Sequence, residues 1–145
     1  MIKGFFERLL GVGDSTASDA DARLALTALL VRVARADFSY DAVEQAQIDK
    51  VISRRYALSS AETEALRREA EALEAEAPDT VRFTRAIKDA VPYDERIAVV
   101  QSLWSVVLAD ATRDEHEDAL LRMVANLLGV SDRDSNLARQ RASGA

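Results

Sequence analysis

Two stretches of the chain, residues 24–34 and 97–109, are apolar around nearly the whole circumference of a helix. A helix with so little polar surface must be buried on all sides, because exposed apolar area is unfavourable in water. Each stretch is interrupted by polar residues and is shorter than the roughly 20 residues that a bilayer-spanning helix needs. The sequence therefore predicts two helices at the centre of a globular domain.

The composition predicts that the rest of the fold is helical as well. The chain contains only 5 Gly and 2 Pro, and it is rich in Ala, Leu, Glu and Arg, which favour helices. Apolar residues do not alternate with polar ones as they would in strands. We predict an all-α fold whose helices cover residues 19–36, 41–56 and 61–77, a shorter segment from 81 to the break before Pro92, and residues 93–109, 114–128 and 131–139.

We expect one helical domain over residues 18–140, with a tail at 141–145. Residues 1–17 are interpreted as an amphipathic segment and a linker, which either docks on the domain or touches a membrane surface peripherally. The first residues are charged and lack the long apolar run of a signal peptide, and no transmembrane span is expected. A cytoplasmic location is the expectation that follows.

Several classes of chemistry are absent from the sequence. With no cysteine, the chain has no thiolate nucleophile and no cysteine-ligated metal site. The single histidine, His116, lies between two glutamates near a predicted helix start and is interpreted as a solvated residue. No phosphate-binding loop and no Ser/His/Asp set is visible. A net charge of −6 argues against nucleic-acid binding and is compatible with a cation or a basic partner.

One acidic motif occurs twice, at residues 36–44 and 109–117, with the shared pattern A-D-x-[ST]-x-D-x-x-E. Each copy follows one of the two apolar helices and opens an amphipathic one. Similar endings, at residues 56–59 and 128–131, follow each copy. Two copies in the same context predict an internal duplication, with two related helical units around the two central helices.

These features together resemble the TerB-like (tellurite-resistance TerB) family, over about residues 23–134. The acidic motif, the Tyr93-Asp94-Glu95-Arg96 stretch and the Leu127–Ser131 ending carry the resemblance. The glycine that follows Ala-Asp in the family signature is Phe38 in one copy and Ala111 in the other. The resemblance implies a multihelical domain with a link to tellurite resistance, stress response or membrane-associated complexes. It also implies metal-contacting or acidic surface roles for Asp37, Glu44, Asp110 and Glu117.

The residues of the motif allow two interpretations. Ca²⁺ and Mg²⁺ prefer oxygen ligands, and each motif offers several carboxylates across a helix junction. The metal hypothesis names as ligands Asp37, Asp41, Glu44, Asp110, Asp114 and Glu117. In the other interpretation Asp41-x-x-Glu44 and Asp114-x-x-Glu117 are capping boxes, which stabilise a helix start without any metal.

Our leading functional hypothesis is a non-enzymatic stress-response or interaction domain that binds a divalent cation and a protein partner. Its link to tellurite would be indirect, because no thiol is present to reduce or ligate tellurium. One alternative is a metal-free scaffold that docks partners through the charged helix 61–77 and the N-terminal segment. A minor alternative is a metal-dependent hydrolase, which requires a cleft that joins the two acidic clusters.

Overall fold

The computed structural model describes residues 19–37, 40–76, 80–109 and 115–144. The side chains of Asp19, Asp37 and residues 115–118 lie outside the described part, as does the predicted N-terminal segment 1–17. The described residues form helices and turns without any strand, which confirms the predicted all-α class. The elements are α2 (Asp19–Ala34), the 3₁₀ turn η1 (Arg35–Asp37), α3 (Ala42–Tyr56), α4 (Ser60–Glu76), α5 (Val81–Ala90), α6 (Tyr93–Ala109), α7 (Glu115–Leu127) and α8 (Asp132–Ala142).

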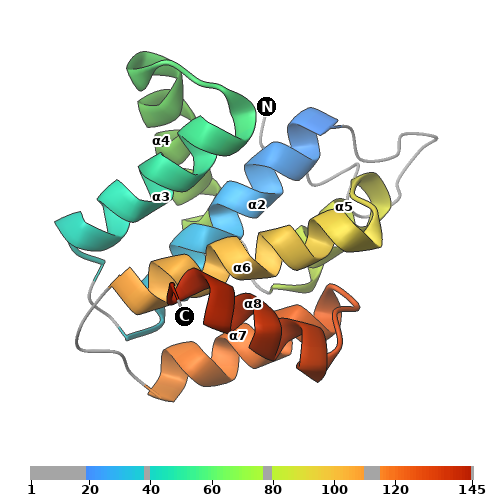
Figure 1. Cartoon of the computed structure of the whole chain (residues 1–145). Helices are drawn as coiled ribbons and strands as arrows, with labels where there is room; N and C mark the ends of the chain where they lie inside the picture. The colour runs from blue at the N-terminus through green and yellow to red at the C-terminus, as the bar shows by residue number, and fades with distance from the viewer. Residues whose placement is uncertain (1–18, 38–39, 77–79, 110–114, 145) are drawn as a thin grey trace.

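Helices α2 and α6 form the centre of the molecule, as their apolar sequences predict (Figure 1). No residue from Leu24 to Val31 is more than 8% exposed. Helix α2 packs against α3, α4, α5, α6 and α7, and α6 packs most extensively against α8. Burial on nearly every side explains why α2 carries so few polar residues, whereas α6 keeps a stripe with Gln101, Ser102 and Ser105 that is only partly buried.

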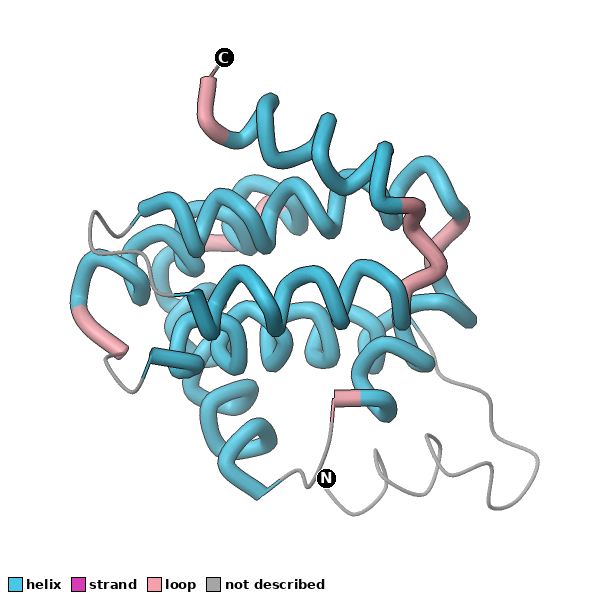
Figure 2. Tube along the Cα trace, turned by 90° about the horizontal axis from the view of Figure 1, so that it is seen from below, coloured by secondary structure: helices cyan, strands magenta, loops and turns pink. Residues whose placement is uncertain are grey.

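The outer helices cover this centre on different sides (Figures 1 and 2). Helices α3 and α4 lie on one side of α2, while α7 and α8 lie together on the far side of α6. Helices α2 and α6 both end at the side of the molecule where α3 and α7 begin (Figure 1). The turn η1, which follows α2, packs against α7. The described parts of the two acidic motifs therefore lie at one end of the bundle.

The helices that open with the two motifs end in the same way. Helix α3 is followed by Ala57 in the left-handed conformation, with φ of 54°, and α7 by Gly129 with φ of 74°. At the second end, the N–H of Val130 donates to Ala125 O (2.9 Å) and the N–H of Gly129 donates to Asn126 O (3.0 Å). This pair of hydrogen bonds is a Schellman motif, and it ends α7 at Leu127, one residue before the predicted end at 128. The duplication itself remains a prediction, because residues 110–114 of the second motif lie outside the described residues.

The last helix is longer than the sequence indicated. Helix α8 continues to Ala142, three residues beyond the predicted end at 139 and into the predicted tail. Its start is fixed by Ser131, whose hydroxyl accepts a hydrogen bond of 3.1 Å from the N–H of Asp134. Its end is held because Ala142 packs against the core. Tertiary packing thus extends a helix whose own sequence is strongly polar.

Candidate acidic site at the end of the bundle

The start of α3 is a capping box formed by Asp41 and Glu44. Asp41 Oδ1 accepts a hydrogen bond of 3.0 Å from the N–H of Glu44, and Glu44 Oε1 accepts one of 3.4 Å from the N–H of Asp41. The spacing of these two acids in the sequence predicts this geometry, and the structure confirms it. One oxygen of Asp41 is thus engaged with the helix start.

A second capping box in the same chain gives a direct comparison. At the start of α4, Ser59 Oγ accepts from the N–H of Glu62 (3.2 Å), and Glu62 Oε1 accepts from the N–H of Ser59 (2.9 Å). Glu62 is exposed, and the backbone N–H of Ser59 lowers the pKa of its carboxyl group. Glu44 occupies the equivalent position but is 0% exposed. The two glutamates therefore have the same capping role but differ in burial, so the packing around α3, and not the capping box, sets the position of Glu44.

The other predicted ligands can be placed only in part. Asp37 lies in η1 and Glu117 in α7, but their side chains are outside the described part of the chain. Asp110 and Asp114 lie outside it altogether, and so does the His116 side chain. Among the side chains that are described, no group of three or more histidine, aspartate or glutamate residues could hold a metal ion. The set of six ligands therefore remains a prediction, with Asp41 and Glu44 as its described members.

An ionic network ties this end of the bundle to α4. Arg35 of η1 donates to Glu74 Oε1 (2.7 Å), and its guanidinium lies over the ring of Tyr40 at 5.0 Å. Tyr40, which directly precedes Asp41, donates from its hydroxyl to Glu71 Oε2 at 2.5 Å. Both acids belong to α4, so this helix holds the segments on either side of residues 38–39.

The network continues along α4 in both directions. Arg67 binds Glu71 (3.1 Å) and Asp49 of α3 (2.7 Å), and Arg32 of α2 binds Glu74 (3.0 Å). The Glu74 side chain is only 11% exposed. Helix α4 is therefore an outer helix with one face bound to the rest of the fold through ion pairs. A signal was present in the sequence, since Arg67, Glu71 and Glu74 share the helical spacing of the buried Ala70 and Leu73.

The surroundings of Tyr40 favour its neutral form. Burial is the largest cause that raises the pKa of its phenol above the ordinary value of 10.0, and the hydrogen bond and negative charge of Glu71 raise it further. The phenol therefore acts as a permanent donor to Glu71 at neutral pH. This donor holds the residue before the acidic motif's helix in a fixed position against α4.

No helix of the described part is both long and apolar enough to cross a bilayer.

Comparison with known proteins places the chain in a family. No curated protein and no solved structure is similar enough to match the chain. A family model described as "Tellurite resistance protein TerB" matches residues 23–140, which include every described helix except the first turn of α2 and the last residues of α8. The chain belongs to the TerB family.

Proposed function

We propose that this TerB domain is a non-enzymatic interaction module that binds a divalent cation at the acidic end of its bundle. The proposed ligands are Asp37, Asp41 and Glu44 from the first motif, and Asp110, Asp114 and Glu117 from the second. All of these donors are carboxylate oxygens, which suit Ca²⁺ or Mg²⁺. The bound cation would set the affinity of the domain for a protein partner.

The observation that carries the proposal is the complete burial of Glu44. Glu62 performs the same capping role in α4 while it remains in solvent, so a helix start in this chain does not need a buried carboxylate. A cation bound there would take the buried Glu44 carboxylate as one of its oxygen ligands. It would also have to overcome the positive end of the α3 dipole, which several carboxylates together can do.

The arrangement of the elements supports a shared site. Helices α2 and α6 end on the same side of the molecule, and η1 packs against α7, which begins at the second motif (Figure 1). This arrangement would allow carboxylates from the two copies to contribute to one site. A site built from both copies would need no complete ligand set within either loop.

The proposed role in tellurite resistance is indirect. The chain contains no cysteine, so it offers no thiol for the reduction or ligation of tellurium. A domain that changes its partner affinity with cation binding can act in a stress response without catalysing a reaction. Because α4 binds Arg35, which precedes the first motif, and Tyr40 within it, α4 is the described element best placed to transmit such a change.

The test is thermal unfolding of metal-stripped protein with Ca²⁺, Mg²⁺, Mn²⁺ or Zn²⁺ added singly. Wild type is compared with Glu44→Gln and with the matched control Glu62→Gln, since glutamine retains the capping hydrogen bond at either position. A cation at about 100 times its Kd adds ~2.7 kcal/mol. For a domain of this size the melting temperature should rise by about 5 °C.

The two variants separate the proposal from its alternative. Cation binding predicts a rise in wild type and Glu62→Gln that is lost in Glu44→Gln. A flat response to all four ions in all three proteins would refute cation binding. It would favour the metal-free scaffold, in which the acidic motifs only cap helices.

A further inference from the structure

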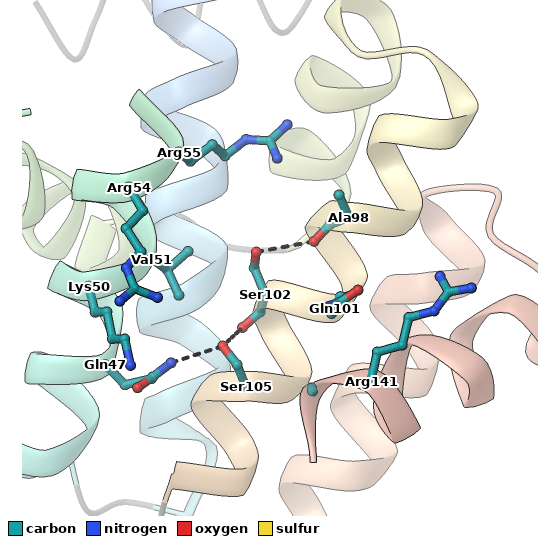
Figure 3. Close-up of a pocket in the computed structure, with 11 residues that line it drawn as sticks. Gln47, Lys50, Val51, Arg54, Arg55, Ala98, Gln101, Ser102, Ser105 and Arg141 are labelled. Atoms are coloured by element: carbon teal, nitrogen blue, oxygen red, sulfur yellow. Dashed lines mark hydrogen bonds between the residues drawn. The ribbon is translucent and has the colours of Figure 1, made fainter. Parts of the chain in front are cut away.

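A second surface feature lies on the face formed by α3, α6 and α8. A groove of about 500 Å³ runs over the outer face of α6, between α3 on one side and the end of α8 on the other (Figure 3). Its α6 wall consists of Ala98, Gln101, Ser102 and Ser105. Gln101, Ser102 and Ser105 form a partly buried polar stripe on this helix, whose buried residues are all apolar apart from the indole N–H of Trp104. Among the described elements, α3 and α8 flank this stripe but do not cover it fully.

The groove is strongly basic although the chain carries a net charge of −6. Lys50, Arg54 and Arg55 line it from α3, and Arg141 lines it from α8. None of the described residues that line the groove is acidic. Within the described part of the chain, no ion pair joins any of these four side chains to a carboxylate.

The helix dipole favours Arg54, Arg55 and Arg141, which lie in the last turns of α3 and α8, but it does not explain why Lys50 lines the same groove. Lys50 and Arg54 lie four residues apart on one helix face, where like charges repel each other. The neighbouring acid Asp49 could have balanced Lys50, but it binds Arg67 on the opposite, α4-facing side. Figure 3 shows Lys50 and Arg54 side by side with Gln47 on the α3 wall, while Arg55 reaches toward α6. The Gln47 amide donates to Ser105 Oγ at 3.3 Å and thereby connects the two walls.

We propose that this groove binds a ligand with two or more linked phosphate groups. Arginine and lysine bind phosphate oxygens through charge-assisted hydrogen bonds, and the amide of Gln101 adds a neutral donor on α6. In Figure 3 the Arg141 guanidinium lies across α6 from Lys50 and Arg54, so the cations line both walls of the groove and are not gathered around one point. A chain of phosphates matches this distribution better than a single phosphate does. The volume of the groove is that of a small-molecule site.

The experiment is calorimetric titration of the full chain with tripolyphosphate in metal-free buffer. Wild type is compared with Lys50→Gln/Arg54→Gln and with the control Arg68→Gln/Arg85→Gln. Both double variants remove two positive charges at exposed positions, and Arg68 and Arg85 do not line the groove. Melting curves establish that both variants fold. We expect the groove variant to bind about tenfold more weakly or worse, and the control to stay within about twofold of wild type.

Two further arms identify the ligand. Inorganic phosphate should bind at least about tenfold more weakly than tripolyphosphate, because it reaches only part of the groove. Adenosine triphosphate at equal affinity would identify the phosphate chain as the recognised group, and tighter binding would identify a nucleotide. The proposal is overturned if tripolyphosphate does not bind, if phosphate binds equally well, or if the control loses as much affinity as the groove variant. Glu44→Gln should bind tripolyphosphate as wild type does. The phosphate proposal and the cation proposal are therefore tested independently of each other.

Discussion

The hydroxyl of Tyr40 donates a hydrogen bond of 2.5 Å to the carboxylate of Glu71, across 31 positions of the sequence. Tyr40 immediately precedes the helix cap at Asp41, and Glu71 lies in the middle of α4. The bond therefore joins the first acidic motif to α4, a helix that lies outside the motif. Glu71 and Glu74 resemble ordinary surface charges in the sequence, but they hold this end of the bundle in place.

Removal of this hydroxyl should destabilise the domain. Tyr40→Phe keeps the ring beneath Arg35 and deletes only the donor to Glu71. We expect a loss of about 1 kcal/mol in the free energy of unfolding, because a hydrogen bond to a charged group that is partly exposed is worth about that much. Urea unfolding of wild type, Tyr40→Phe, Glu71→Gln and the double variant measures the effect. A coupling energy near zero in this cycle would mean that the bond contributes nothing to stability.

The same bond predicts a loss of stability at high pH. The pKa of the Tyr40 phenol is raised in the folded protein above its ordinary value of 10.0, so folding favours the protonated form. Its contribution is complete below about pH 10, where the unfolded phenol is also protonated, and it falls as the pH rises beyond that value. We expect the unfolding free energy of wild type to decline more steeply above pH 10 than that of Tyr40→Phe.

An alkaline absorbance titration provides an independent check. Burial also raises the pKa of Tyr56, so two of the three tyrosines should titrate above the ordinary range. In Tyr40→Phe, one of these late-titrating groups should disappear. A wild-type titration with all three phenols near pH 10 would contradict the assignment.

The single tryptophan offers a further test of the core. Trp104 is 3% exposed, and its indole N–H donates to Ser135 Oγ of α8 at 3.2 Å. Ser135→Ala leaves this buried donor without its partner, which should cost about 1–3 kcal/mol. Chemical unfolding followed by Trp104 fluorescence measures the loss. Ser143→Ala, at an exposed position near the end of the same helix, should change stability by less than about 0.5 kcal/mol.

Much of the fold could be predicted because its determinants are local. The apolar sequence of α2 and α6 requires burial, and the breaks at Ser59, Pro92 and Gly129 mark helix ends through cap and turn chemistry. The end of α8 was underestimated, since its sequence is polar and only the packing of Ala142 extends it. Long-range packing of this kind leaves no periodic signal in a short polar helix.

The candidate site was less accessible to prediction. The Asp41–Glu44 spacing indicated a capping box, but nothing in the motif distinguished it from the Ser59–Glu62 box. The difference in burial between Glu44 and Glu62 arises from the elements packed around α3, not from the local sequence. The basic groove was missed for the same reason, because Arg141 is distant in sequence from Lys50 and Arg54. Only the fold brings these cations to one surface.

The paired ends of α3 and α7 support a final prediction, in which opposite substitutions have opposite effects. Ala57 and Gly129 both adopt positive φ, a conformation that strains residues with a Cβ atom and is easy for glycine. Ala57→Gly should therefore stabilise the domain by about 0.5–1 kcal/mol. Gly129→Ala should destabilise it by about 1 kcal/mol or more. The added methyl group would also lie 3.1 Å from Arg96 Nη1, which donates to Leu128 O.

Thermal melts of both variants at neutral pH check this prediction, with Gly144→Ala as the matched control. Gly144 has φ of 80°, but a Cβ atom there meets open space at the end of the chain, so the structured core should not sense its strain. If Ala57→Gly lowers the melting temperature, the extra freedom of glycine in the unfolded chain outweighs the relief of strain. In that case the two helix ends would be alike in backbone geometry but not in energy, and their similarity would lend less weight to the duplication that the sequence predicts.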